Sequence, residues 1–532
     1  MFGMEKPATD IYTFKNLREG GFTYVDKTGL ILPLADMSIG KQFFIARPRR
    51  FGKSLLVSTL QCLFEGRREL FEGLKIEPKW DWSKTWPVLH LDMGDCQAAT
   101  VEEFWGKVKD ILKDEAQRLD VPYPKAETIP GVFRLLIQSL AAKSKDKQMV
   151  LLVDEYDKPL LGHLAKPDVT AFRDALKSFY STIKTSEGLQ RFTFLTGVSK
   201  FSKVSIFSDL NNLIDLTMDP DHVTLLGYTH EEVKKNYPSM IRALGEKFGI
   251  DSETALSVIV GMYDGYRFDV NAEPVINPVS LGNCLRQKQF GFYWAETAVP
   301  TFLIEILKRR PLNFRTIDLP ASALGTYEPE HPTIETLLYQ TGYLTIKGSR
   351  VIGRDMKRIP PNPGMTVYEL GFPNQEVERS FLEDLVGAYV GLEKIDANNL
   401  QRIAGEALLA NDVPRFLKAM DGFFRSIPYS LTDRQNEQMW QTIVWTVLKS
   451  VGVYANGEVQ TADGRVDMTV ETPTDVYLIE FKLDDTAANA IAQIREKNYA
   501  APFALSQKRI TLIGLGFSSE QRTVTDSAVE AL

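Results

Sequence analysis

Cysteine and histidine are both scarce in this sequence of 532 residues. The three cysteines, Cys62, Cys96 and Cys284, lie far apart along the chain, and none of the five histidines lies three to five residues from another. This scarcity excludes a disulfide framework and a zinc ribbon, because both need partners at short, regular spacings. Free cysteines are typical of a reducing compartment, so we expect a cytoplasmic protein.

Long hydrophobic runs are also missing. No uninterrupted apolar stretch reaches the roughly 20 residues that a helix needs to cross a bilayer. The opening residues MFGMEKPATDIYTF lack the basic start, apolar stretch and small-residue cleavage site of a secretory signal peptide. We therefore expect no membrane partner.

An excess of basic charge is the third absence, because 62 Lys and Arg stand against 69 Asp and Glu. Residues 431–532 alone contain nine basic and fourteen acidic residues. Proteins that bind nucleic acid without sequence preference do so mainly through a basic face, so any nucleic acid would be gripped elsewhere or only after assembly. Two short basic clusters are candidates for that grip, although such clusters are more often solvated helix ends or loops: Lys308-Arg309-Arg310, and Arg354 with Lys357 and Arg358.

Two carboxylates and a lysine near the end of the chain are the most informative residues that are present. Asp467 lies in the run GRVDMTV, and Glu480 and Lys482 lie in VYLIEFKL. The apolar, β-branched neighbours predict two adjacent buried strands joined by a turn at 471–475. Buried carboxylates are costly unless a cation binds them, and Mg²⁺ favours one or two carboxylates plus water. Lys482 shares the strand face of Glu480, where it would orient a metal-bound water or stabilise negative charge.

This pattern predicts a metal-dependent centre that cuts phosphodiester bonds in DNA or RNA. It resembles the signature of the PD-(D/E)XK nuclease superfamily, which implies metal ligands at Asp467 and Glu480 and a catalytic role for both and for Lys482. The superfamily often adds a Glu on the preceding helix and a Gln on the following one, which implies Glu437 as a further metal ligand and Gln493 nearby. The metal would be Mg²⁺, with Mn²⁺ as a substitute. The alternative is an ion pair between strands at the surface.

A phosphate-binding loop is predicted where an apolar strand at 42–46, the segment RPRRFGKS and a helix follow one another. Gly52, Lys53 and Ser54 supply a flexible backbone, an ammonium for the terminal phosphates and a hydroxyl for Mg²⁺. Arg47 stands where the generic motif has its first glycine, so the loop is a variant whose arginines would add positive charge beside the phosphates. The residues expected to hold the nucleotide are consecutive: Arg49, Arg50, Phe51, Gly52, Lys53, Ser54 and Leu55.

A second motif follows about a hundred residues later, where the apolar run QMVLLVDEYDKPL predicts a buried parallel strand. Asp154, at its carboxyl end, would hold Mg²⁺ together with Ser54, and Glu155 would polarise the attacking water. A further apolar strand, RFTFLTGVSK, ends in polar residues, among which Ser199 would sense the γ-phosphate. The alternative for both motifs is a set of ordinary α/β turns.

The segments YVDKTGLI, RPRRFGKSLL, LLVDEYDKPL, LTGVSKFS and YDGYRF occur in this order. Together they resemble the bacterial AAA-ATPase-like family, whose members often carry a C-terminal PD-(D/E)XK domain and the same variant loop. The resemblance implies that residues 24–27 pack near the nucleotide, although a surface turn with a salt bridge explains them equally well. Residues 263–267 would face the nucleotide from a helical lid or form a tight Asp-Gly turn with aromatic packing.

The fold class that we expect is α/β, with a P-loop NTPase parallel sheet, a helical lid region and a small PD-(D/E)XK nuclease-like domain. Strands are predicted near residues 42, 88, 149, 192 and 213, and a capping box at Thr229 and Glu232. The expected domains are an ATPase core at 1–226, a helical lid or winged-helix-like domain at 227–363, a helical connector at 364–430 and the nuclease-like domain at 431–532.

These patterns predict a protein that binds and hydrolyses ATP and carries a Mg²⁺-dependent nuclease, with nucleotide state controlling cleavage. Two alternatives stay open. In one, the protein is a nucleotide-dependent switch or assembly protein whose C-terminal domain is an inactive partner-binding module. In the other, nucleotide binds at Lys53 but is hydrolysed slowly. Neither excludes a homo-oligomer.

Overall fold

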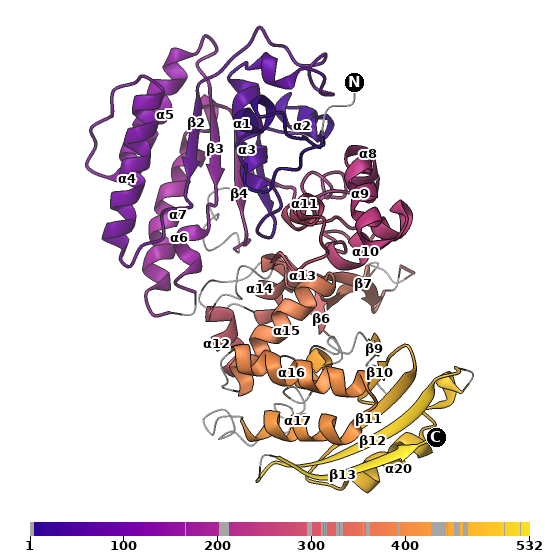
Figure 1. Cartoon of the computed structure of the whole chain (residues 1–532). Helices are drawn as coiled ribbons and strands as arrows, with labels where there is room; N and C mark the ends of the chain where they lie inside the picture. Colours follow the sequence, from indigo (N-terminus) through magenta and orange to yellow (C-terminus); the bar gives the residue numbers. More distant parts are fainter. Residues whose placement is uncertain are drawn as a thin grey trace. The chain divides into compact units, whose positions relative to one another are not determined.

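Five apolar segments of the N-terminal half form a parallel β-sheet in this computed structural model of the protein (Figure 1). The strand order is β2-β3-β4-β1-β5, and all four pairs of neighbours are parallel. The apolar runs QFFIA and MVLLVD are buried along their whole length, as expected for strands covered on both faces. The five predicted strands are therefore confirmed: β1 (Gln42–Ala46), β2 (Val88–Asp92), β3 (Met149–Asp154), β4 (Gln190–Gly197) and β5 (Ile214–Asp215).

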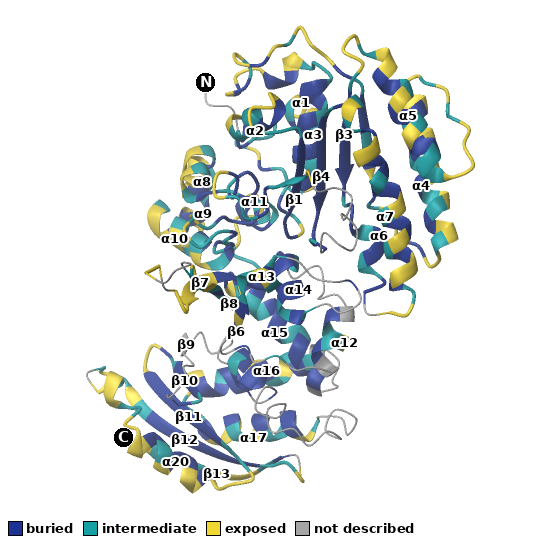
Figure 2. Ribbon diagram, turned by 180° about the vertical axis from the view of Figure 1, so that it is seen from behind, coloured by how far each residue is buried: buried dark blue, intermediate teal, exposed yellow. Residues whose placement is uncertain are grey.

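Helices cover both sides of this sheet, with α1, α2 and α3 on one side and α4, α5 and α7 on the other (Figure 1). Their outward faces are exposed while the strands are buried (Figure 2). The helix bounds are α1 (Phe14–Glu19), α2 (Thr28–Ala35), α3 (Lys53–Phe64), α4 (Val101–Arg118), α5 (Ile129–Lys143), α6 (Lys158–Leu161) and α7 (Val169–Thr185).

The structure divides into two units by contacts within the chain. The first comprises residues 1–294 and 318–376, and the second comprises residues 295–317 and 377–532. The predicted domain boundaries at 226, 363 and 430 stay predictions, although the two units divide the chain elsewhere. The residues that the structure describes are 5–164, 166–201, 212–294, 301–309, 312, 314, 317–325, 329, 333–354, 356–357, 362–390, 394–426, 443, 445–451, 458–460, 466–504, 506–521 and 523–532.

Residues 227–294 are helical, as predicted. The predicted capping box is confirmed, because the Thr229 hydroxyl accepts from the Glu232 N–H and the Glu232 carboxylate accepts from the Thr229 N–H. A small apolar core holds these helices together. Their bounds are α8 (His230–Asn236), α9 (Pro238–Phe248), α10 (Ser252–Tyr263) and α11 (Pro278–Gln287).

A three-stranded sheet of order β6-β8-β7 follows in the first unit, together with two short helices. The helical expectations for residues 227–363 and 364–430 were thus incomplete, because β7 in the first range and β8 in the second form an antiparallel pair. The stability of this pair comes from cross-strand contacts rather than from local periodicity. The elements are β6 (Ile317–Pro320), α13 (Ala321–Leu324), α14 (Ile334–Thr341), β7 (Thr345–Ile352) and β8 (Met365–Gly371).

The second unit contains a five-stranded sheet of order β13-β12-β11-β10-β9, in which β11 and β12 are parallel and the other pairs antiparallel. The predicted hairpin is confirmed as β10 (Met468–Glu471) followed by β11 (Asp475–Leu483). Helix α20 packs on one face, where Val476 and Leu478 meet Ile491 and Ile494. The other elements are α12 (Thr301–Arg309), α15 (Gln375–Val390), α16 (Lys394–Leu409), α17 (Val413–Arg425), β9 (Glu458–Gln460), α20 (Ala487–Glu496), β12 (Arg509–Ser518) and β13 (Thr523–Ala531).

Among the described residues, no helix has both the length and the apolar composition that a bilayer crossing requires.

Candidate functional site

The loop between β1 and α3 is shaped by two residues with left-handed backbone conformations. Arg50 has φ 68°, and Gly52, the N-cap of α3, has φ 90°. A glycine adopts this conformation without a steric penalty, whereas an arginine does so only when tertiary contacts hold it. Lys53 and Ser54 then open the helix, so unpaired backbone N–H groups and the positive end of the helix dipole face the loop. This backbone is of the kind that phosphate-binding loops use, and phosphate binding itself stays a prediction.

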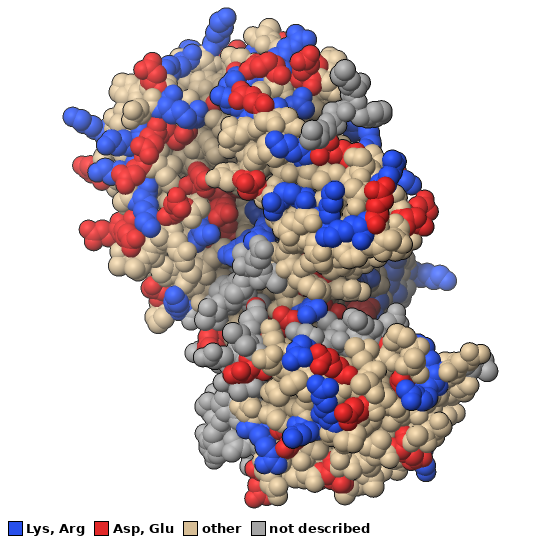
Figure 3. Space-filling view, in the orientation of Figure 1, with Lys and Arg blue, Asp and Glu red and all other residues tan. Residues whose placement is uncertain are grey.

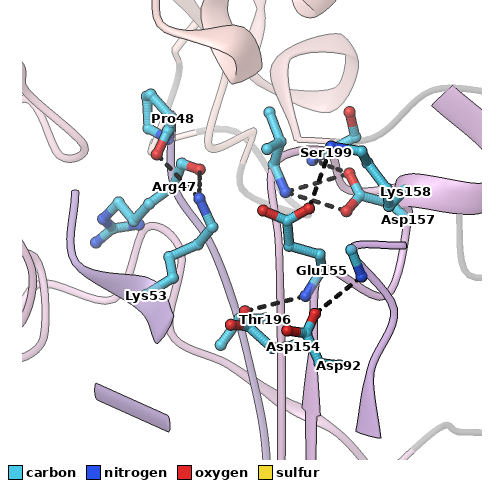
Figure 4. Close-up of polar contacts among 12 residues, drawn as sticks. Arg47, Pro48, Lys53, Asp92, Asp154, Glu155, Asp157, Lys158, Thr196 and Ser199 are labelled. Carbon is cyan, nitrogen blue, oxygen red and sulfur yellow. Dashed lines mark hydrogen bonds and ion pairs between the residues drawn. The ribbon is translucent and has the colours of Figure 1, made fainter. Parts of the chain in front are cut away.

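Lys53 is folded back onto its own loop (Figure 4). Its Nζ donates hydrogen bonds to the carbonyl oxygens of Arg47, at 2.9 Å, and Pro48, at 3.0 Å. Burial lowers the pKa of Lys53, and the carboxylates of Asp154, Glu155 and Asp157 oppose that shift. An ammonium held this way is buried yet satisfied, and an incoming phosphate would compete with the two carbonyl oxygens for it.

Arg47 turns away from the phosphate side of the loop, contrary to the expectation that it adds charge there. Its guanidinium lies 3.8 Å from the centre of the Phe268 ring and donates to the carbonyl oxygens of Thr217, at 2.7 Å, and Ala46, at 2.9 Å. Only 1% of the residue is exposed, and this burial lowers the pKa of Arg47 to about 10. The arginine at the position of the first glycine therefore anchors the loop to residues far along the chain.

Of the next three loop residues, Arg50 and Phe51 contact other parts of the first unit, whereas Arg49 is exposed. Arg50 donates to the carbonyl oxygen of Tyr293 at 2.7 Å, and the Phe51 ring packs edge-on against Tyr266 with centroids 4.8 Å apart. Arg49 is exposed and lines the cavity beside the loop. Arg50 lines the same cavity but is less exposed, so Arg49 is the more open of the two to a bound anion.

The carboxylates at the end of β3 face Lys53 across the edge of the sheet (Figure 4). Asp154 is buried and accepts hydrogen bonds from the Thr196 hydroxyl of β4 and from the Glu155 N–H, the latter at 3.0 Å. Glu155 has φ 50°, a left-handed conformation that is rare outside glycine, and its carboxylate lies 3.4 Å from the Lys158 ammonium. Such strained residues cluster at functional sites.

Asp157 was not among the predicted site residues, although it is the third carboxylate of the run VDEYDKPL. Its carboxylate accepts from the backbone N–H groups of Val198, at 3.1 Å, and Ser199, at 2.6 Å. Burial raises the pKa of Asp157 to about 6 despite these hydrogen bonds. The Ser199 hydroxyl is buried and makes no hydrogen bond within the described part of the chain. Asp157 therefore fixes the turn that carries Ser199.

A cavity of about 440 Å³ opens beside the loop. Loop residues 49–56 and the side chains of Glu155 and Lys158 form one wall, and segments 8–12, 23–25 and 225–228 form the others. Asp154 and Ser199 are not among the lining residues. The volume falls within the range of small-molecule and cofactor sites.

Residues 24–27 and residues 263–267, each of which had two possible interpretations, differ in whether they line this cavity. Tyr24 and Lys27 line it, and the Lys27 ammonium binds the Glu232 carboxylate at 2.6 Å. Asp26 accepts hydrogen bonds from the backbone N–H groups of Thr28 and Lys75, each at 2.9 Å, and so holds a turn. Residues 263–267 are not among the lining residues, which favours the turn with aromatic packing.

Two hydrogen bonds join Asp467 to the Glu480-Phe481 segment of β11 in the second unit. The Asp467 N–H donates to the Glu480 carboxylate at 3.0 Å, and the Phe481 N–H donates to the Asp467 carboxylate at 2.9 Å. Glu480 is only 3% exposed. The antiparallel pairing of β10 with β11 brings the two carboxylates together from positions 13 residues apart.

Lys482 shares the strand face of Glu480, as predicted, and α20 covers this face. The Gln493 side chain of α20 bridges them, because its amide N–H donates to Glu480 while its carbonyl oxygen accepts from Lys482. The Lys482 ammonium is 3.7 Å from the Glu480 carboxylate. Glu437, Arg310 and Arg358 lie outside the described residues.

Within the described ranges, no three acidic, histidine or cysteine side chains come together in a group that could hold a metal ion. The oxygen donors of Asp467 and Glu480 match the one or two carboxylates that Mg²⁺ uses alongside water. The donor set is therefore of the kind that suits this ion.

Comparisons with known proteins give one family match in each half of the chain. Residues 8–207 match the family described as "Predicted AAA-ATPase", and residues 435–527 match the PD-(D/E)XK nuclease superfamily. The chain is 35% identical over 537 residues to an "Uncharacterized protein in vnfD 5'region" of Azotobacter chroococcum mcd 1, with 98% of each chain covered. The chain belongs to the predicted AAA-ATPase family and carries a C-terminal domain of the PD-(D/E)XK nuclease superfamily.

Proposed function

We propose that this protein binds and hydrolyses ATP and cleaves phosphodiester bonds of DNA or RNA with Mg²⁺, under control of the bound nucleotide. The observation that carries the nuclease assignment is the convergence of Asp467, Glu480, Lys482 and Gln493 on one end of β11. A lysine beside a buried carboxylate has no apolar packing role, and its chemistry suits phosphoryl transfer.

The nucleotide-binding role follows from the loop and the cavity. The phosphates would lie on the N–H groups that open α3, while Lys53 exchanges its two carbonyl partners for phosphate oxygens. Ser54 and Asp154 would hold Mg²⁺, and Glu155 would polarise the attacking water. Segments 8–12 and 23–25 leave room beside the loop for the nucleoside.

At the nuclease site, Asp467 and Glu480 would hold Mg²⁺ or Mn²⁺. The ion when bound lowers the pKa of its water and neutralises charge on the phosphate. Gln493 keeps the Lys482 ammonium beside the Glu480 carboxylate, where it can orient a nucleophilic water. Glu437 would add a further ligand by family resemblance.

The distribution of charge on the second unit affects its expected affinity for nucleic acid. On the face that Figure 3 shows, basic and acidic side chains are interspersed over this unit. Several of its arginines are paired with acids, among them Arg402 with Glu406 and Arg425 with Asp421. Since a basic face supplies most nonspecific affinity for nucleic acid, we expect the second unit alone to bind nucleic acid weakly.

Cleavage assays test the proposal most directly. Linear, circular and single-stranded DNA and RNA are incubated with Mg²⁺ or Mn²⁺, with and without ATP. Glu480→Gln should abolish cleavage, whereas Glu496→Gln, an exposed change on α20, should leave it unchanged. Lys53→Ala should remove any ATP effect, with Lys109→Ala on the exposed side of α4 as its control.

An inactive C-terminal module is the second candidate. The observation that favours it is that Lys482 already has partners in Gln493 and Glu480, an arrangement that an ion-pair cluster would also show. In that case the wild-type protein would bind nucleotide at the loop but cleave no substrate with either metal. Cleavage that disappears in Glu480→Gln would exclude this candidate.

A further inference from the structure

The chain passes between its two units at points that lie close to the nucleotide-binding loop. Trp294 is the last residue of the first unit before the chain enters residues 295–317, and Glu376 is the last before it enters residues 377–532. These two residues belong to the same unit as the loop, although 82 positions separate them in sequence.

Glu376 joins these two exit points. Its carboxylate accepts a hydrogen bond from the Trp294 N–H at 2.7 Å, and only 1% of the residue is exposed. A buried carboxylate is costly, so a structural tie alone would be made as well by a neutral acceptor. Burial raises the pKa of Glu376 to about 7, and the guanidinium of Arg50 opposes this shift.

Arg50 connects the nucleotide-binding loop to the same place. Its guanidinium donates to the Tyr293 carbonyl oxygen at 2.7 Å, and Tyr293 directly precedes Trp294. The left-handed backbone of Arg50 is a strained conformation for a residue with a side chain, so a change elsewhere in the loop can shift it. The loop is therefore linked to both exit points by two hydrogen bonds, Arg50 to Tyr293 and Trp294 to Glu376, which the peptide bond between Tyr293 and Trp294 connects.

Binding of a nucleotide would change the hydrogen bonds that hold the loop. Lys53 donates to the carbonyl oxygens of Arg47 and Pro48, which lie three and two residues before Arg50, respectively. A phosphate that draws the Lys53 ammonium to itself leaves these carbonyl oxygens without their donor. The backbone that leads into Arg50 must then find new partners, and the Arg50 contact with Tyr293 lies next in the chain.

We propose that Glu376 is a positioning residue that, with Arg50, transmits the nucleotide state of the loop to both segments leading into the nuclease-bearing unit. We refer to Arg50, Tyr293, Trp294 and Glu376 together as the exit clamp. The proposal rests on the proposed function, since it assumes that nucleotide binds at the loop. The exit clamp would be the physical connection through which bound nucleotide controls the nuclease-bearing unit.

The test compares the full-length wild type with Glu376→Gln, which keeps the side-chain volume and an acceptor oxygen. Glu246→Gln, an exposed change on α9, is the matched control. Three quantities are measured: affinity for a fluorescent ATP analogue, hydrogen exchange of peptides from α12 and α15 with and without ATP, and cleavage with and without ATP. Circular dichroism confirms that each variant is folded.

We expect Glu376→Gln to bind the analogue within about threefold of wild type, since the residue does not line the cavity. The change in α12 and α15 exchange that ATP causes in wild type should be lost, together with the ATP effect on cleavage. Glu246→Gln should respond like wild type. If Glu376→Gln fails to fold, Arg50→Lys tests the same clamp from the loop side, with exchange as its readout.

Two results overturn the clamp. An ATP response in Glu376→Gln equal to that of wild type excludes its role in transmission. A wild-type protein that binds the analogue but shows no change in exchange or cleavage excludes it as well. A wild type that binds no nucleotide overturns the proposed function itself, and the affinity measurement separates that failure from the others.

Discussion

The Asp467 backbone N–H and the Glu480 carboxylate are 3.0 Å apart, and the Asp467 carboxylate accepts in return from the residue after Glu480. This reciprocal bracing fixes the separation and orientation of the two carboxylates before any metal arrives. Preorganised ligands lose less conformational freedom on binding a cation, so the pair is suited to hold one.

Asp467→Asn tests this pair. The amide can still accept the hydrogen bond from Phe481, so the fold should persist, but it no longer supplies a charged ligand. Changes in groups that merely support a metal ligand cost 10–100-fold, so loss of the ligand should lower the rate at least about 100-fold. Initial rates measured over a Mg²⁺ titration check this. Cleavage at the wild-type rate and at the same Mg²⁺ concentration would remove Asp467 from the centre.

Lys53→Ala and Glu155→Gln separate nucleotide binding from hydrolysis. Lys53→Ala removes the ammonium for the phosphates and should weaken affinity for ATP, whereas Glu155→Gln should keep affinity and lower phosphate release about 100-fold, as loss of a general base does. Equilibrium titration and a phosphate-release assay measure the two quantities. If wild type itself releases phosphate as slowly as Glu155→Gln, the protein is a slow-hydrolysing switch.

Arg47→Met should destabilise the first unit rather than act on the phosphates directly. The change leaves the carbonyl oxygens of Thr217 and Ala46 without their donor and removes the cation–π contact with Phe268. Buried groups left unpaired cost about 1–3 kcal/mol each, so the melting temperature should fall by several degrees. An unchanged melting temperature with lost ATP affinity would return Arg47 to the role predicted from the sequence.

Glu376 predicts a pH dependence of stability. Its pKa is about 7 in the folded chain and near 4.5 when unfolded, because burial disfavours the charged form. Between these values the folded state binds more protons than the unfolded state, so stability falls as pH rises through this window. The loss is about 3 kcal/mol between pH 4.5 and 7, and it levels off above.

Urea unfolding of wild type and Glu376→Gln at about pH 5 and about pH 7.5 measures this effect. The difference between the two proteins should shift in favour of the variant at the higher pH, because glutamine does not ionise. A difference that is independent of pH would mean that Glu376 does not titrate in this range.

Local patterns were sufficient for much of the architecture. The five strands of the parallel sheet, the capping box of α8 and the β10–β11 hairpin all depend on neighbours within a few residues or on continuous apolar runs, which a sequence displays directly. The β7–β8 pair was missed because each of these strands is stabilised by contacts with the other strand, and such contacts leave no local pattern in the sequence. The expected positions of Gly52, Lys53 and Ser54 at the start of α3 also followed from local spacing.

The amino-acid order was therefore enough to identify the chemical groups and the elements that carry them. The partners that several of those groups face depend on how the chain folds. Arg47 meets the Thr217 carbonyl 170 residues away, and Glu376 meets Trp294 across 82 residues. Such contacts depend on how distant segments pack, and a charged side chain looks the same in sequence whether it meets a phosphate or a buried carbonyl. Burial and long-range hydrogen bonding settle that choice, and neither has a local signature.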